Sequence, residues 1–148
     1  MVMKNVRDIL LSKGYANVYS VEPGAMVVEA LKLMAEKQLG ALLVLENGKP
    51  VGLFSERDYA RKVTLMERSS RTTEVRQVMT ADLICVGPTD TMEYCMELMT
   101  EKHIRHLPVL ENNKLIGMIS IGDLVKNIIE DQKAMILQLE KYMRGETY

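Results

Sequence analysis

The chain has 148 residues, 47% of them hydrophobic and 26% charged, which is the composition of a folded domain and not of a disordered or fibrous chain. Its 19 Lys and Arg nearly balance 20 Asp and Glu, and the net charge of −1 excludes a nonspecific binder of nucleic acid or of an anionic membrane. Two cysteines without Cys-x-x-Cys spacing argue against a disulfide framework and a zinc site and favour a reduced, cytoplasmic protein. Charges at the N-terminus predict no signal peptide, and short apolar runs predict no membrane span.

The sequence contains an internal repeat with an offset of 65 residues. This shift aligns 21–58 with 86–123 without a gap, and 15 of the 38 aligned positions are identical. Chance would give about two or three identities, so each half is one supersecondary unit. A unit of this size buries little surface alone, and we expect the halves to pack together about a pseudo-twofold axis. Their junction is then the expected place of function.

Each unit begins with a short extended segment, 18–21 or 83–86, followed by a Pro-containing turn and a helix. The helices are predicted from apolar residues that recur at helical spacing and give each helix one buried face. These residues are Val27, Ala30, Leu31 and Met34 in the first unit and Met92, Cys95, Met96 and Met99 in the second. A methionine-rich surface for varied partners is the alternative. Most of the methionines align with aliphatic residues of the other unit, which favours core packing.

Two short strands and a second helix complete each unit. The strands are expected at 41–45 and 51–54, and again at 107–110 and 115–119, joined by Asn-Gly or Asn-Asn hairpin turns. The last helix is expected from about Gly122 to Met143. Its part beyond Asp131 has no counterpart in the first unit, where 63–75 indicates an interrupted helix and a linker. Such an amphipathic tail packs on the body or on another subunit.

The strongest repeated motif is Gly-x-x-Ser-x-x-Asp, found at 52–58 and 117–123. Ser55 and Ser120, with the free N–H groups of a first helical turn, can hold a phosphate. Asp58 and Asp123 can accept both hydroxyl protons of a ribose. Alternatively, each Ser is an N-cap and each Asp the third residue of a capping box. Occurrence of the motif twice, with a Gly that admits a ligand or backbone, favours binding.

Four features together resemble a tandem pair of CBS domains, a Bateman module. They are the repeated motif, the His-Ile-Arg-His-Leu-Pro-Val segment at 103–109, the Val-Met-Thr segment at 78–80 and the duplicated strand-helix-strand-strand-helix order. The Ser-Glu-Arg-Asp-Tyr segment at 55–59 looks like the small stand-alone bacterial CBS-pair proteins. The resemblance implies an α/β fold of two β-α-β-β-α repeats in one compact module with an extended C-terminal helix. The boundaries expected are 1–70 for repeat 1 with its N-terminal helix and linker, 71–130 for repeat 2 and 131–148 for the tail.

The resemblance also implies a regulatory function without catalysis. Members of this family bind adenine nucleotides such as AMP, ADP, ATP or NAD(H) in clefts between the repeats, and the expected partners are a second copy in a homodimer and an unknown effector protein. Carried over by position, the first cleft consists of Ser55, Arg57, Asp58, Thr80, Asp82, Ile84, Arg105 and His106. The second consists of Asn17, Val18, Tyr19, Ala41, Ser120 and Asp123.

The roles implied for these residues differ between the clefts. Each Asp holds a ribose and each Ser a phosphate, while the segments 80–84 and 17–19 border the adenine. Arg105 and His106 supply phosphate contacts, or they are simply an exposed arginine and a half-buried strand histidine. Gly40 and Ala41 stand at the matching positions of the first repeat, so the two clefts need not share affinity. Arg57 adds positive charge beside the first ribose site, or lies on a solvated helix face.

Other functions find less support in the sequence. His103 and His106 are the two histidines, neither cysteine has an evident activating neighbour, and no Gly-rich phosphate loop is present, so we expect no enzymatic activity. One alternative is a ligand-independent interaction module that makes its contacts through 133–142. A cleft for single-stranded nucleic acid is a weaker alternative, because one Phe and no Trp offer few stacking platforms.

Overall fold

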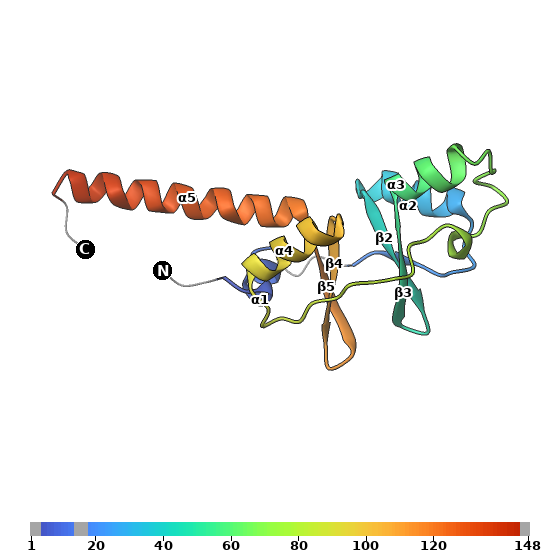
Figure 1. The fold of residues 1–148 in the computed structure, drawn as a ribbon, viewed down its shortest axis with the longest axis horizontal. Helices are drawn as coiled ribbons and strands as arrows, with labels where there is room; N and C mark the ends of the chain where they lie inside the picture. Colours follow the sequence, from blue (N-terminus) through green and yellow to red (C-terminus); the bar gives the residue numbers. More distant parts are fainter. Residues whose placement is uncertain (1–3, 14–17, 146–148) are drawn as a thin grey trace.

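The computed structural model describes residues 4–13 and 18–145 and shows two α/β units side by side, with a long helix projecting from the second (Figure 1). The first part of the chain forms α1 (Val6–Ser12), β1 (Ser20–Val21), α2 (Val27–Lys37), β2 (Ala41–Glu46), β3 (Lys49–Ser55) and α3 (Glu56–Asp58), which continues as a π-helical turn (Tyr59–Thr64). After a 3-10 turn (Val75–Gln77), the second part forms α4 (Met92–Lys102), β4 (His106–Glu111), β5 (Lys114–Ser120) and α5 (Ile121–Met143). The duplicated order of helix, hairpin and helix is confirmed.

The two sheets are alike in their hairpins and differ at their edges. In the first repeat β1 runs parallel to β2, and β2 pairs with β3 in an antiparallel hairpin. In the second repeat the hairpin of β4 and β5 stands as a two-stranded sheet. The strand expected at 83–86 is reduced to one bridge, because only Val86 bonds to β4 through both its N–H and its C=O. The fold class is as predicted, with one strand fewer.

Each repeat has its own hydrophobic core, and the chain crosses between them. The first core combines α2, β2 and β3 with Val63, Val75 and Val78. The second combines α4, β4, β5 and the start of α5 with Val6, Ile9 and Leu10 of α1. Thus α1 precedes the first repeat in sequence and packs in the second repeat. The N-terminal helix therefore packs against the C-terminal repeat, and the end of α1 lies at the seam between the repeats.

The predicted helix faces are largely buried, with one exception. Met92, Cys95 and Met99 are buried in α4, but Met96 is 40% exposed. The prediction for Met96 is wrong, because the buried face of α4 is limited to Met92, Cys95 and Met99, which belong to the second core. Tyr94, also on α4, is 45% exposed, so this helix presents an apolar surface to the solvent.

The last helix confirms the predicted extension and projects beyond the body of the fold (Figure 1). Leu124 and Asn127 are buried against the second repeat, whereas residues 132–140 are all exposed. Its apolar side chains therefore form an uncovered stripe over the tail. Among the described residues, no helix combines the length and the apolar character that crossing a bilayer requires.

Candidate functional site

Both Ser-x-x-Asp segments form capping boxes at the start of a helix. The backbone N–H of Ser55 donates to Asp58 Oδ2 at 3.0 Å, and the N–H of Asp58 donates to Ser55 Oγ at 3.2 Å. The equivalent distances at Ser120 and Asp123 are 2.8 and 3.2 Å. Reciprocal bonds of this kind satisfy N–H groups that a helix start leaves unpaired. The capping interpretation of the motif is therefore confirmed at both sites, which we call the first corner (Ser55 to Asp58) and the second corner (Ser120 to Asp123). A ligand can bind only to polar atoms that these capping bonds leave available.

Asp58 has partners on both carboxylate oxygens. Besides the cap bond, Ser55 Oγ lies 3.1 Å from Oδ2, while Oδ1 accepts from Thr80 Oγ1 and from Lys62 Nζ, each at 3.1 Å. The residue is 6% exposed. Thr80, predicted to share a cleft with Asp58, is thus brought to it, and its backbone also pairs with Leu53 of β3. The first corner is closed by protein groups.

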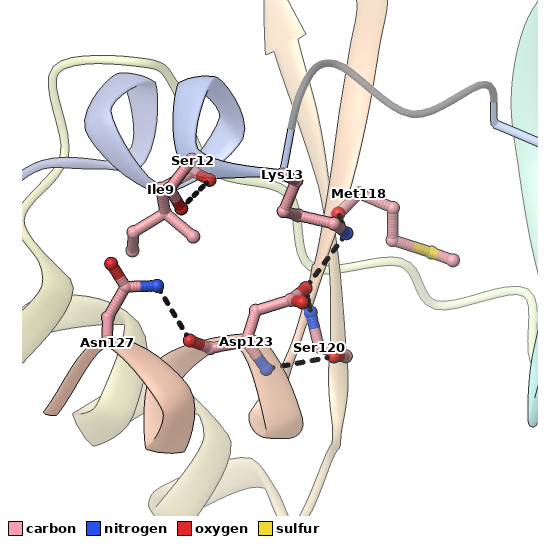
Figure 2. Close-up of polar contacts among 7 residues, drawn as sticks. All are labelled: Ile9, Ser12, Lys13, Met118, Ser120, Asp123 and Asn127. Atoms are coloured by element: carbon pink, nitrogen blue, oxygen red, sulfur yellow. Dashed lines mark hydrogen bonds and ion pairs between the residues drawn. The ribbon is translucent and has the colours of Figure 1, made fainter. Parts of the chain in front are cut away.

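The ammonium group that pairs with Asp123 belongs to a residue on another element of the fold. Lys13, which caps the C-terminus of α1, donates from Nζ to Asp123 Oδ2 at 2.9 Å and to the carbonyl oxygen of Met118 at 2.8 Å (Figure 2). Asn127 stands where the first repeat has Lys62, and its Nδ2 donates to the backbone carbonyl of Asp123 at 2.8 Å. The carboxylate of the second corner is therefore held by a residue 110 positions away in sequence, at the end of the helix that packs in the second repeat.

The glycine of each motif lets another segment of the chain pack closely against the strand. A Cβ at Gly52 would lie 2.5 Å from Met79 Sδ and 3.2 Å from the Thr80 carbonyl oxygen. A Cβ at Gly117 would lie 2.7 Å from Leu10 Cδ2. The linker between the two repeats, through Met79 and Thr80, thus occupies the approach in the first repeat, and α1 occupies it in the second. These glycines explain how the crossing segments dock against β3 and β5.

A pocket of about 330 Å³ opens at the seam between the repeats. Val18, Tyr19 and Ala41 of the first repeat line one side, and the segment 116–118 of β5 lines the other. These three residues were predicted for the second cleft, and the structure brings them together, whereas Ser120 and Asp123, predicted for the same cleft, do not line the pocket. Leu10, Lys13, Lys37 and Leu39 complete the lining. Apolar walls with a few charged groups are typical of small-ligand sites.

The two lysines of this pocket were not among the residues predicted from sequence. Lys13 aligns with Val78 under the 65-residue offset, so the repeat gave no signal for it. Lys37 is matched by Lys102, but an isolated lysine at a helix end has no distinctive pattern. In the structure Lys37 Nζ lies 5.3 Å from the centre of the Tyr19 ring, a cation–π distance. Two ammonium groups thus line the pocket, Lys13 paired with Asp123 at 2.9 Å and Lys37 with Glu36 at 3.8 Å.

Arg105 and His106 lie beside the second corner. His106 pairs with Ser120 in the sheet register, and the carbonyl oxygen of Arg105 accepts from Ile121 N–H at 2.9 Å. They were predicted for the first cleft, with Asp58, and that assignment stays a prediction. Burial lowers the pKa of His106, Lys13 and Arg105 lower it further, and Asp123 opposes the shift. The imidazole is therefore favoured in its neutral form, in which it can accept one hydrogen bond and donate another.

The remaining predicted residues differ in placement. Arg57 and Asp82 are exposed, and Ile84 is partly buried against the second core. Asn17 lies outside the described residues. Their predicted roles around a nucleotide remain predictions, because exposure and packing alone do not assign a ligand contact.

The duplicated fold agrees with comparison to known proteins. The family model of the CBS domain matches residues 6–64 and again 75–130. The chain belongs to the CBS-domain family. The two matches confirm the tandem pair, and their first residue is the start of α1, the helix that packs in the second CBS repeat.

Known relatives include both sequences and solved structures. The mitochondrial CBS domain-containing protein CBSX3 of Arabidopsis thaliana is 38% identical over 148 residues, which span 95% of this chain and 72% of the relative. A CBS-domain protein from Burkholderia ambifaria has 50% identity and a TM-score of 0.84, covering 87% of this chain and 96% of that one. The CBS pair of protein MJ0100, solved with 5′-methylthioadenosine and S-adenosyl-L-methionine, shares the fold at 17% identity, with a TM-score of 0.77 over 88% and 99% of the two chains.

Proposed function

We propose that this CBS pair is a regulatory module that binds an adenine nucleotide at the seam between its repeats and signals to a partner protein. The ligand is AMP, ADP, ATP or NAD(H), and its occupancy changes the packing of the repeats or of a dimer, a population shift with no catalytic step. A cytoplasmic location fits such a sensor of small metabolites. The adenosine-containing ligands of the distantly related MJ0100 pair support the chemical class.

The pocket of about 330 Å³ at the seam carries this proposal, and it shares Lys13 and Met118 with the second corner. Its volume falls in the range of small-molecule sites, about 300–1,000 Å³. Tyr19 and Ala41 offer apolar surface for a purine, and Asp123 lies beyond Lys13 as the acceptor for ribose hydroxyls. Both lysines can face phosphates. The first corner has the same motif, but Asp58 is 6% exposed and already holds Lys62 and Thr80.

Isothermal titration with AMP, ATP and NADH tests the proposal. We expect binding tighter than millimolar for at least one of them, and its loss in Asp123→Asn. Asp131→Asn is the matched control, because Asp131 lies on the same helix and pairs with Lys4 at 2.8 Å at the opposite end of α1. If all three nucleotides fail to bind wild type, or if Asp123→Asn binds as wild type does, the proposed site is wrong.

Asp58→Ala measures the contribution of the first corner in the same titration. If both clefts bind, Asp58→Ala and Asp123→Ala each remove one class of site. If the second cleft alone binds, only Asp123→Ala changes the stoichiometry. Full stoichiometry in both variants would contradict the ribose assignment of this aspartate pair.

A protein-interaction module that works without ligand is the second candidate, and the uncovered stripe on α5 favours it. Ile136 and Leu139 are 56% and 55% exposed, and Met143 is 83% exposed, although all three are apolar. At a spacing of three and four residues they share one face of the helix. We infer that this face pairs with the same face of a second copy, because a self-complementary apolar stripe suits the symmetric contact of a homodimer.

Truncation after Asp131 separates the two candidates. If the truncated chain becomes monomeric in sedimentation while it retains nucleotide binding, the tail serves assembly and the seam serves the ligand. If the truncated chain stays dimeric, the assignment of the dimer contact to this tail is wrong. If full-length protein binds no nucleotide but forms a stable complex that truncation abolishes, the ligand-independent function is the correct one.

A further inference from the structure

Lys13 links the two ends of the candidate site. It follows the last residue of α1, beside the seam, and bridges Asp123 Oδ2 and the Met118 carbonyl oxygen of the second repeat (Figure 2). The side chains of Lys13 and Asp123 are 30% and 19% exposed. Such a partly hydrated ion pair is weak enough for a ligand to exchange. Lys13 also lines the pocket itself, so a bound molecule meets its ammonium group directly.

The position of Lys13 creates a competition for Asp123. A ribose that donates both hydroxyls to this carboxylate competes with the ammonium for Oδ2, the oxygen that Lys13 contacts. An uncharged nucleoside that displaces Lys13 leaves the lysine without an anion. A 5′-phosphorylated nucleoside brings an anion of its own, to which the ammonium can donate. A lysine ammonium has three donors, and the contacts with Asp123 and Met118 use two of them, so a phosphate can also be added to the existing arrangement.

The segment of the first repeat that aligns with Arg105 and His106 supplies no basic group to the second cleft. At the positions of Arg105 and His106 it has Gly40 and Ala41. Lys13 comes from outside the repeat, and Lys37 faces the same pocket from the end of α2. Both ammonium groups line one pocket, and each also pairs with a carboxylate, Lys13 with Asp123 and Lys37 with Glu36. Two cations in the lining favour an anionic ligand over a cationic one. Lys13 is the more specific of the two because it also contacts the predicted ribose carboxylate.

We propose that Lys13 is a specificity-determining residue of the second cleft, which makes that cleft select phosphorylated adenosine over adenosine itself. The inference rests on the proposed function and deepens it, because it names the class of ligand and the residue that recognises the phosphate. The lysine holds Asp123 while the cleft is empty and pairs with the phosphate when the ribose takes the carboxylate. The first corner has no equivalent, because its ammonium comes from Lys62, four residues from Asp58 on the same helical segment.

Titration of AMP and of adenosine into wild type, Lys13→Met and Lys13→Arg tests this inference. We expect wild type to prefer AMP, and we expect Lys13→Met to reduce that preference by about tenfold or more, as for loss of a charge-assisted hydrogen bond. Adenosine should bind Lys13→Met as well as wild type or better, because its competitor is gone. Lys13→Arg keeps the charge and should retain most of the preference. Lys114→Met, an exposed lysine on β5, controls for the change in net charge.

The outcomes distinguish this inference from the proposed function. If wild type binds AMP but Lys13→Met weakens AMP and adenosine by the same factor, Lys13 has a structural role and the inference is wrong. The same holds if Lys114→Met lowers the preference equally. If Asp123→Asn abolishes binding while Lys13→Met keeps the wild-type preference, the site stands and only the role of Lys13 falls. If wild type binds neither ligand, the proposed function fails and the inference with it.

Discussion

The two Ser-x-x-Asp corners have the same backbone geometry and different surroundings. Each has a reciprocal capping box. The first carboxylate then takes its ammonium from Lys62, one helical turn away, whereas the second takes it from Lys13, which is 110 residues distant in sequence. The comparison shows that duplication kept the local cap, which a few adjacent residues determine, and that the ionic partner diverged. A local partner closes the first corner, and a distant partner makes the second one depend on α1.

The largest expected difference between the corners is in stability. Asp58→Ala removes an acceptor that is 6% exposed and serves Ser55, Thr80 and Lys62, and we expect it to lower the free energy of unfolding by about 2–3 kcal/mol. Asp123→Ala removes a cap and a partly exposed ion pair, at a cost of about 1 kcal/mol. Urea unfolding followed by circular dichroism measures both. Equal losses would contradict the contrast between a closed and an exchangeable corner.

Substitution of the glycine in each motif tests which segment packs against each corner. Gly117→Ala places a Cβ against Leu10, which is 3% exposed, and we expect a loss of about 1–3 kcal/mol with faster hydrogen exchange confined to α1. Gly52→Ala meets Met79 and the Thr80 backbone, with a similar cost and faster exchange in the linker. Hydrogen exchange read by mass spectrometry separates the two. Loosening of the same segment in both variants would show that the crossing segments are not independent.

The local part of this fold was predictable from sequence because neighbouring residues decide it. The Asn turns, the alternating runs of the hairpins and the Ser-x-x-Asp caps depend on positions within a few residues of each other. The expected strand at 83–86 was too long, since pairing along a short edge depends on how many backbone groups reach β4. One residue, Val86, does so on both sides.

The tertiary part could not be predicted from one sequence. Apolar spacing indicated helix faces, but it did not say that Val6, Ile9 and Leu10 pack in the second core instead of the first. The pocket group of Val18, Tyr19 and Ala41 followed from family resemblance. Lys13 did not, because a single lysine between a helix and a loop has no pattern. Its importance arises from the crossing of α1, which long-range packing determines.

A smaller difference between the repeats is expected in their response to acid. His106 stands where the first repeat has Ala41, and burial lowers its pKa. The unfolded chain therefore binds a proton more readily than the folded one, and stability is lost as pH falls below about 6.5. We expect His106→Gln to lose less stability than wild type between pH 7.5 and pH 5.5 in urea unfolding. An identical pH dependence in the two proteins would contradict a buried, neutral imidazole at this corner.

The smallest expected effect is a change in the pKa of His106 when Lys13 is replaced, and it is measured without any ligand. Because Lys13 lowers the pKa of His106 and Asp123 raises it, Lys13→Met should move that pKa upward for two reasons: it removes a like charge and leaves the carboxylate unneutralised. The imidazole signals in a pH titration by nuclear magnetic resonance report this directly, and His103, exposed at the end of α4, gives a second signal for reference. Lys62→Met, the equivalent change at the first corner, should leave the titration of His106 unchanged. If both variants shift it equally, the two corners are electrostatically joined across the seam and the distinction between a local and a distant lysine loses its meaning.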